Sequence, residues 1–388
     1  MRYCTLGDLT PGMVLGRSIY DASGRLLLNE SKALDDRFIK RIEELGFSGA
    51  YIDAAGFEAV DPPEVIDPAL RARTQAILVE SFDTLANISS VLEDVNFSEL
   101  TSFDSHPELH KMLSVGKIQG QINQIIDDLM DSYTIELPCL LLKSQGRLLV
   151  EHSTDTMLIA LLIGLNFKFV YRELKQLGLA AMLHDVGKAL LGTAGEPPIG
   201  PDHPNYKDHP ATGGIILLES GTNHYTECAA IQQHHERQDG KGFPNHLIGY
   251  NKSPEQSRTY QSGTIYRMAE IISVADAYDT LTSGIYAAPL SPEEAIKTLI
   301  KRSFFEFNSY VVNMLAQVVQ VFPVGCHVEI VKSSDPTYQN YCGIIKAANT
   351  ENAHQAELIL TDDPYGKATK PVLLSLSGDS SAQLKLLL

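Results

Sequence analysis

Seven side chains that carry nitrogen or oxygen donors recur along the middle of the chain, inside or at the ends of helical patterns. Any one of them is weak evidence, because a single histidine is more often a surface or core residue than a ligand. Together they supply imidazole and carboxylate groups, which are ligands for divalent transition-metal ions. The candidate metal ligands are His152, His184, Asp185, His209, His234, His235 and Asp276.

Asp185 is the residue that we expect to join two metals, because each of its two carboxylate oxygens can bind a different cation. Metals bridged at about 3.5 to 4 Å can hold a shared hydroxide in line with a phosphorus atom and stabilise the leaving oxygen. The pattern therefore predicts phosphodiester hydrolysis. The first metal is assigned to His152, His184, Asp185 and Asp276, and the second to Asp185, His209, His234 and His235.

Each metal then has four protein ligands, and the hydroxide and phosphate oxygens would complete a six-coordinate shell. Shells of nitrogen and oxygen ligands favour iron or manganese over the tetrahedral geometry of structural zinc. We therefore expect two divalent metal ions as cofactors, iron or manganese, although relative affinities alone do not exclude nickel, cobalt or zinc.

Four motifs in this order resemble the HD-GYP subgroup of the HD-domain phosphohydrolases. They are HDVGK, an HP pair followed by a glycine-containing helix, HHERQDGKGFP, and VADAYDTLTS. The resemblance covers roughly residues 130 to 320. The opening LTPGMVLGRSIYDASGRLLL is similar to a small domain that precedes many such modules. Members of the subgroup hydrolyse cyclic di-GMP to linear pGpG or to GMP, and the resemblance implies this activity here, with the seven ligands assigned as above.

The resemblance also implies that Lys188 contacts a substrate phosphate, so Asp185 and Lys188 are the candidate catalytic residues. Lys188 follows His184 by one helical turn, so both side chains can face the same pocket. In the family, the loop that here reads GKGFP frames the site and can contact partner proteins. Gly242 permits backbone conformations that other residues avoid, and Phe243 keeps the aromatic ring of the family's tyrosine. The candidate substrate contacts are Lys188, Lys241, Gly242, Phe243 and Arg267.

Two departures from the family pattern limit what the resemblance implies. Some members bind a third metal through a glutamate at the position of Leu148, and Glu151 would project about 100° away from His152. We therefore predict two metals. Members also continue LTS with a DRPY-like stretch whose arginine meets phosphate, whereas this chain reads LTSGIYAAPL. Arg267, Lys241 or Arg237 could compensate for the missing arginine.

Three functions remain open at this point. The first is a cyclic di-GMP phosphodiesterase. The second, favoured by the missing arginine, is a degenerate sensor or protein-interaction module that binds cyclic di-GMP without turnover. The third is a phosphohydrolase of another cyclic dinucleotide or nucleotide. Besides the nucleotide, a protein partner at the GFP loop and a homodimer are partner hypotheses.

The elements that must position these residues indicate a mainly α fold. We predict a small α+β domain over residues 1–60, with a helix over 34–45, and a linker with packing helices over 61–130. An all-helical HD-GYP domain over 131–322 follows, interrupted by the loops GTAGEPPIGPDHP and DGKGFPNHLIGYNKSPEQ, and a small β domain over 323–388 closes the chain. His203 is expected to be a solvent-exposed loop residue, and Glu236, Asp239 and Asp279 to support ligands or cap backbone groups.

Composition excludes several classes of protein. The net charge of −17, from 31 basic and 48 acidic residues, repels polymeric nucleic acid and anionic lipid. The longest apolar run, Met157 to Leu165, has nine residues, whereas a membrane span needs about 20. With no signal-peptide pattern at the N-terminus, we expect a cytoplasmic protein without membrane insertion. Five cysteines without a CxxC pair indicate reduced thiols.

Overall fold

The computed structural model describes most of the chain, in segments separated by short gaps. These segments are residues 1–20, 25–44, 47, 49–62, 65–89, 113–131, 148–192, 199–220, 224–255, 262–322, 324–347, 356–376, 379 and 381–387. The predictions for 90–112, 132–147, 193–198 and 256–261 lie outside the described residues.

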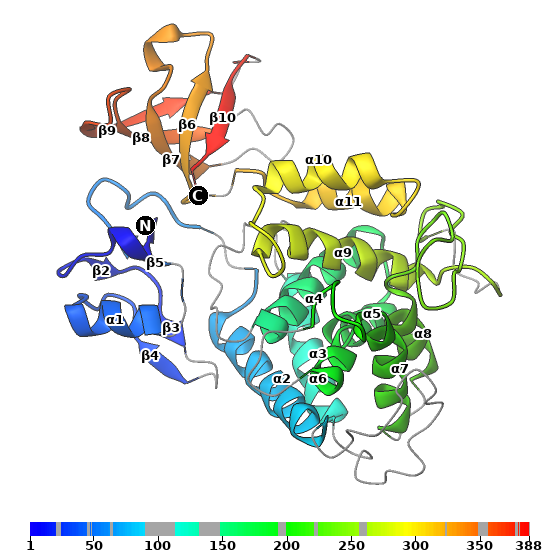
Figure 1. Cartoon of the computed structure of the whole chain (residues 1–388). Helices are drawn as coiled ribbons and strands as arrows, with labels where there is room; N and C mark the ends of the chain where they lie inside the picture. The colour runs from blue at the N-terminus through cyan, green and yellow to red at the C-terminus, as the bar shows by residue number, and fades with distance from the viewer. Residues whose placement is uncertain are drawn as a thin grey trace.

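The middle of the chain is a body of packed helices around one hydrophobic core (Figure 1). Leu78 and Leu85 on the first of these helices and Ile122 and Ile126 on the second belong to this core. The two predicted packing helices are therefore part of the helical body that carries the candidate ligands. Its helices are α2 (Pro68–Ser89), α3 (Val115–Asp131), α4 (Leu148–Asn166), α5 (Tyr171–Met182), α6 (Val186–Leu191), α7 (His209–Glu219), α8 (Tyr225–Gln233), α9 (Arg267–Ser283), α10 (Pro292–Arg302) and α11 (Ser309–Val318).

Helix α4 is the central helix of this body and packs against α2, α5, α9 and α11. By length and composition alone it could cross a membrane, but 78% of its most apolar window is buried among the other helices. Met157 and Leu158 are fully buried, and so are the polar residues Ser153 and Asp155. A helix buried on all sides is apolar all round, so its hydropathy reflects its place in the core.

The N-terminal part is α+β, as predicted. An antiparallel sheet has the strand order β1-β5-β2 (Arg2–Thr5, Gly49–Asp53 and Val14–Leu15), and β3 (Ile19–Tyr20) pairs with β4 (Leu26–Leu28). Helix α1 (Asp36–Glu44) lies where the helix over 34–45 was predicted. Leu15, Ile42 and Ile52 are the centre of a separate small core.

The C-terminal part is a five-stranded antiparallel sheet in the order β10-β6-β7-β8-β9. It confirms the prediction of short strands between turn residues at this end of the chain. The strands are β6 (His327–Lys332), β7 (Cys342–Ala347), β8 (Glu357–Asp362), β9 (Ala368–Ser375) and β10 (Gln383–Leu386).

The N- and C-terminal parts contact each other, which the sequence did not predict. Phe57 and Val60 form a hydrophobic cluster with Ile344 and Ile359 of the C-terminal sheet. The two termini accordingly lie on the same side of the molecule in Figure 1. The division into domains at residues 60, 130 and 322 stays a proposal, and the shared cluster indicates that the two end domains form one unit.

Candidate metal centre

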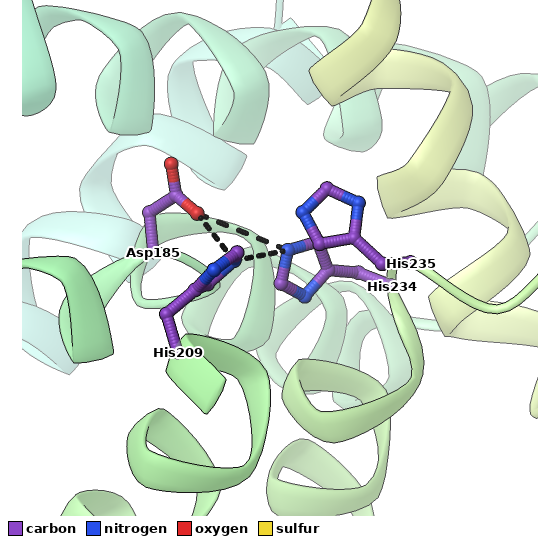
Figure 2. Close-up of side chains that lie close together, drawn as sticks. All are labelled: Asp185, His209, His234 and His235. Atoms are coloured by element: carbon purple, nitrogen blue, oxygen red, sulfur yellow. Dashed lines mark hydrogen bonds and ion pairs between the residues drawn. The ribbon is translucent and has the colours of Figure 1, made fainter. Parts of the chain in front are cut away.

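The structure brings all seven predicted ligands into one cluster at the centre of the helical body. His152 lies on α4, His184 and Asp185 lie between α5 and α6, and Asp276 lies on α9. His209 is the first residue of α7, and His234 and His235 directly follow α8. Within each of two groups, the possible ligand atoms all lie within 4.8 Å of one another. The groups are Asp185 with His209, His234 and His235, shown in Figure 2, and His152 with His184 and Asp276.

The Asp185 carboxylate lies between the two groups and presents one oxygen to each. Its Oδ2 is 3.5 Å from Nε2 of both His152 and His184. Its Oδ1 is 3.2 Å from Nε2 of His209 and 3.8 Å from Nε2 of His234. This is the placement expected of a carboxylate that bridges two cations.

The histidines are held in one tautomer by their second ring nitrogen. Nδ1 of His184 donates to the Ala181 carbonyl at 2.8 Å, and Nδ1 of His234 donates to the Ile231 carbonyl at 2.6 Å. Nδ1 of His209 likewise donates to the carbonyl of Tyr206. A carbonyl oxygen only accepts, so Nδ1 carries the proton and Nε2 keeps its lone pair. Metal-binding histidines are oriented by this kind of contact.

Two observations show that this donor set fits divalent cations. Nε2 of His152 and Nε2 of His184 are 3.2 Å apart, and the same distance separates Nε2 of His209 and His234. Lone pairs that face each other this closely repel unless a cation or proton lies between them. In addition, Oδ1 of Asp185 is buried and accepts no hydrogen bond from the described residues. A cation at each group would satisfy these atoms.

The electrostatics of the cluster also favour cations. Burial lowers the pKa of His184, His209 and His234, so these rings stay neutral. Burial alone would raise the pKa of Asp185, but the nearby imidazoles and the Lys188 ammonium hold it well below its ordinary value. The pKa of Asp276 is also lowered despite burial, chiefly by the hydrogen bond from His152. Burial alone would lower the pKa of His152, but the carboxylates of Asp185, Asp276 and Asp279 raise it well above its ordinary value, so this group of carboxylates favours a positive charge beside it.

Lys188 is buried in the cluster, with only 3% of its surface exposed. Its Nζ donates to Asp185 Oδ2 at 2.6 Å and to the Tyr286 hydroxyl at 3.2 Å. The ammonium also lies 5.1 Å from the centre of the Tyr206 ring and 5.6 Å from that of Tyr286. Lys188 is thus an internal residue of the site and not a solvated lysine at a helix end.

Neither Tyr206 nor Tyr286 is among the candidate site residues predicted from the sequence. Tyr206 precedes α7, and Tyr286 follows α9 inside the LTSGIYAAPL stretch. Neither position carries a motif. For Tyr286 the available signal was the departure from the family pattern, because a stretch that loses an arginine in a phosphate site needs another donor there.

The GFP loop packs back onto the residues that follow α8. A Cβ atom on Gly242 would lie 2.4 Å from the backbone nitrogen of Arg237 and 2.5 Å from the carbonyl oxygen of His235, so this approach requires glycine. The Phe243 ring stacks on the His235 ring, with centroids 4.8 Å apart. Glu236 accepts hydrogen bonds from the backbone nitrogens of Asn245 and Leu247. It therefore organises the loop, as its predicted capping role requires.

Other candidate residues do not join the cluster. Arg267 donates to Glu173 and to the carbonyl of Pro254, and its guanidinium lies over the Phe169 ring. Arg237 is bound to Asp239 and Glu306. Lys241 is exposed on the loop, as is His203 on its own loop. Glu151 is buried on α4 and belongs to neither of the two ligand groups, and the number of metals stays a prediction.

Comparisons with known proteins agree with these motifs. Residues 149–281 match the model of the HD domain family. Cyclic di-GMP phosphodiesterase PA4108 of Pseudomonas aeruginosa is 25% identical over 195 residues, which cover 49% of this chain and 44% of that protein. Cyclic di-GMP phosphodiesterase response regulator RpfG of Xanthomonas campestris pv. campestris is 32% identical over 120 residues, which cover 29% of this chain and 28% of that protein.

The chain thus spans less than half the length of either curated relative. Among solved structures, Bd1817, a HDG"Y"P protein from Bdellovibrio bacteriovorus, aligns over 81% of this chain and 97% of its own, with 16% identity and a TM-score of 0.42. The segment 149–281, which carries the HDVGK, HHERQDGKGFP and VADAYD motifs in order, is an HD domain of the HD-GYP type.

Proposed function

We propose that this protein is a metal-dependent phosphodiesterase that hydrolyses cyclic di-GMP to linear pGpG, to GMP, or to both. One observation carries the proposal: the two oxygens of Asp185 point to two separate groups of metal-binding side chains. A bridged pair of cations is a recurrent solution for phosphodiester hydrolysis. The names of the two curated relatives support cyclic di-GMP as the substrate.

In this proposal, His152, His184, Asp185 and Asp276 hold one divalent cation, and Asp185, His209, His234 and His235 hold the other. Iron or manganese is the metal we propose, from the mixed nitrogen and oxygen ligands. When bound, two such cations supply an acidified water as nucleophile and offset the charge of the phosphate.

The chain's own residues orient the ligands and stabilise charge. The carbonyls of Ala181, Tyr206 and Ile231 fix three ring tautomers, so that each Nε2 faces the centre of the cluster. Lys188 places its ammonium beside Asp185. From there it can stabilise the negative charge that develops on a nonbridging phosphate oxygen. Lys241 and Phe243 remain proposed substrate contacts, and a protein partner at the GFP loop and a homodimer remain predictions.

The test is an assay of anaerobically purified protein whose metal content has been measured. With two metals bound per chain, cyclic di-GMP should be converted to linear product. Asp185→Ala should lose both metals and the activity, whereas Asp202→Ala, at an exposed aspartate, should behave as the parent. A fully metal-loaded protein that makes no linear product contradicts the proposed hydrolysis, and a protein that binds no metal under any condition contradicts the site.

A second candidate function is a sensor that binds cyclic di-GMP without turnover. It is favoured by the contacts of Arg237 and Arg267, which both bind carboxylates away from the cluster and so do not replace the missing arginine. Recovery of intact nucleotide from a tight complex after hours would support it. A third candidate, hydrolysis of another cyclic dinucleotide or nucleotide, is tested by competition among a panel of such nucleotides.

A further inference from the structure

The chain after α9 returns to the metal cluster and brings Tyr286 with it. Gly284, with φ of 73°, ends the helix in the left-handed region that favours glycine. The backbone nitrogen of Leu290 then donates to the carbonyl of Leu281 at 2.8 Å, which closes the turn. The ring of Tyr286 packs against Gly200, where a Cβ atom would lie 3.2 Å from two ring carbons.

The Tyr286 hydroxyl belongs to a short chain of hydrogen bonds that ends at the bridging carboxylate. It accepts from Lys188 Nζ at 3.2 Å and donates to the carbonyl of Ile199 at 3.1 Å. Lys188 Nζ in turn donates to Asp185 Oδ2 at 2.6 Å. The phenol O–H rotates about its C–O bond. It can therefore exchange the carbonyl for a phosphate oxygen that approaches Lys188.

We propose that Tyr286 is a phosphate-contacting residue of this site. Its hydroxyl and the Lys188 ammonium bind the same phosphodiester group, and the Tyr206 ring also contacts the ammonium. This inference rests on the proposed function, because the phosphate is that of the proposed substrate.

The composition of this contact agrees with the substrate class. A phosphodiester carries one negative charge, so one ammonium and one neutral donor can bind it without an arginine. The rings of Tyr206 and Tyr286 both lie within cation–π distance of Lys188 Nζ. They keep the ammonium desolvated and in place, where a charged hydrogen bond is strong.

The test separates the hydroxyl from the ring. Tyr286→Phe keeps the ring, its packing on Gly200 and its cation–π contact, and removes only the hydroxyl, which donates to Ile199 and accepts from Lys188. We expect equilibrium binding of the bis-phosphorothioate analogue of cyclic di-GMP to metal-loaded protein to weaken about tenfold, the usual worth of one such hydrogen bond. KM for cyclic di-GMP should rise by a similar factor, while metal content stays unchanged. Tyr225→Phe, at a residue that is 68% exposed, is the matched control.

The outcomes distinguish this inference from the proposed hydrolysis. If Tyr286→Phe binds the analogue as tightly as the parent, the inference is wrong even when the parent hydrolyses cyclic di-GMP. If the parent binds the analogue without hydrolysing the nucleotide, and Tyr286→Phe weakens that binding, the phosphate contact stands and the hydrolysis does not. A parent protein that neither binds the analogue nor hydrolyses cyclic di-GMP contradicts both.

Discussion

His152 differs from three other histidines of the cluster in the group that holds its Nδ1. His184, His209 and His234 each donate to a carbonyl three residues earlier, within their own turn of chain. Nδ1 of His152 instead contacts the carboxylate of Asp279 on α9, at 2.8 Å. The orientation of this ring therefore depends on a side chain that can be replaced.

Asp279→Asn should weaken metal binding about 10-fold to 100-fold, because partners of ligating histidines orient the ring and raise its basicity. Titration with a competing chelator measures the affinity. Asp202→Asn, at an exposed aspartate, should leave it unchanged. Parental affinity in the Asp279 variant would mean that this carboxyl does not orient His152.

The ligands could be predicted from the sequence, and their neighbours could not. The HDVGK and HHER motifs place their histidine and aspartate ligands close together at helix ends. Local backbone geometry is enough to direct neighbouring ligands of one motif toward the same site. Tyr206 and Tyr286 reach Lys188 only because two separate loops return to the same place in the fold. Arg267 was predicted to contact substrate, and it lies on the same helix as Asp276. Its side chain nevertheless binds Glu173 and does not reach the cluster.

Among the helices, α2 links the N-terminal part to the interior of the helical body. It packs against α6, the helix that carries Lys188, and against α4. Arg71 on α2 forms an ion pair with Asp155 on α4, which is fully buried and lies one turn after His152. Helix α2 thus supplies the counterion of a buried acid next to the site.

Arg71→Ala should lower the free energy of unfolding by about 3 kcal/mol, because it removes the ion pair of a fully buried carboxylate. Urea denaturation measures this change. Arg73→Ala, two residues away and exposed, should cost about 0.5 kcal/mol or less. The double variant Arg71→Ala/Asp155→Ala should be more stable than Arg71→Ala alone, and if it is not, the ion pair is not the cause.

The GFP loop is attached to α9 and α11 by a buried polar network. The Gln238 side chain donates to Glu270 at 2.7 Å and accepts from the backbone nitrogen of Asn251 at 2.9 Å. Asn308 at the start of α11 donates to the carbonyl of Lys252. Burial raises the pKa of Glu270 to about 7, although hydrogen bonds from Gln238 and Asn308 oppose the shift.

Glu270 should make stability fall as pH rises from about 4.5 to about 7. Across this window the unfolded chain has lost the proton and the folded chain still holds it, so deprotonation favours unfolding. Glu270→Gln should remove this dependence and be about 3 kcal/mol more stable than the parent above the window, with no gain below it. Denaturation at several pH values measures the difference, and equal pH profiles would refute the shift.

Across the whole molecule, the two ends of the chain are coupled. Phe57 and Ile359 are both buried in the cluster that joins the N- and C-terminal parts. The backbone nitrogen of Tyr3 also donates to the carbonyl of Gly325. Each end part therefore uses the other to cover apolar surface.

Phe57→Ala should increase amide hydrogen exchange in β7 and β8 of the C-terminal sheet, because it opens a cavity against Ile344 and Ile359. A cavity of this kind costs about 3 to 5 kcal/mol. Phe305→Ala removes the same ring from a site that is 67% exposed, and it should leave exchange in these strands unchanged. Protection that is equal in both variants would show that the two end parts are independent.

Strands and helices of the end parts could be predicted, and their contact could not. The pattern GAYID indicates a strand, and PVLLSLS another, because alternation and turn residues act locally. Nothing local in Phe57 or Ile344 identifies its partner, since each is simply one more apolar residue. Which surfaces meet depends on the complete fold, so the sequence predicts the two end domains but not the contact between them.

The joint cluster of Phe57, Val60, Ile344 and Ile359 makes the helical body an insertion within a unit built from both ends. During synthesis, Phe57 leaves the ribosome roughly 300 residues before Ile359, and contacts between such distant segments form late. The N-terminal part therefore exposes the apolar surface of Phe57 and Val60 to solvent until the helical body has been synthesised and has folded. A nascent chain arrested before β7 would be the form most in need of a chaperone.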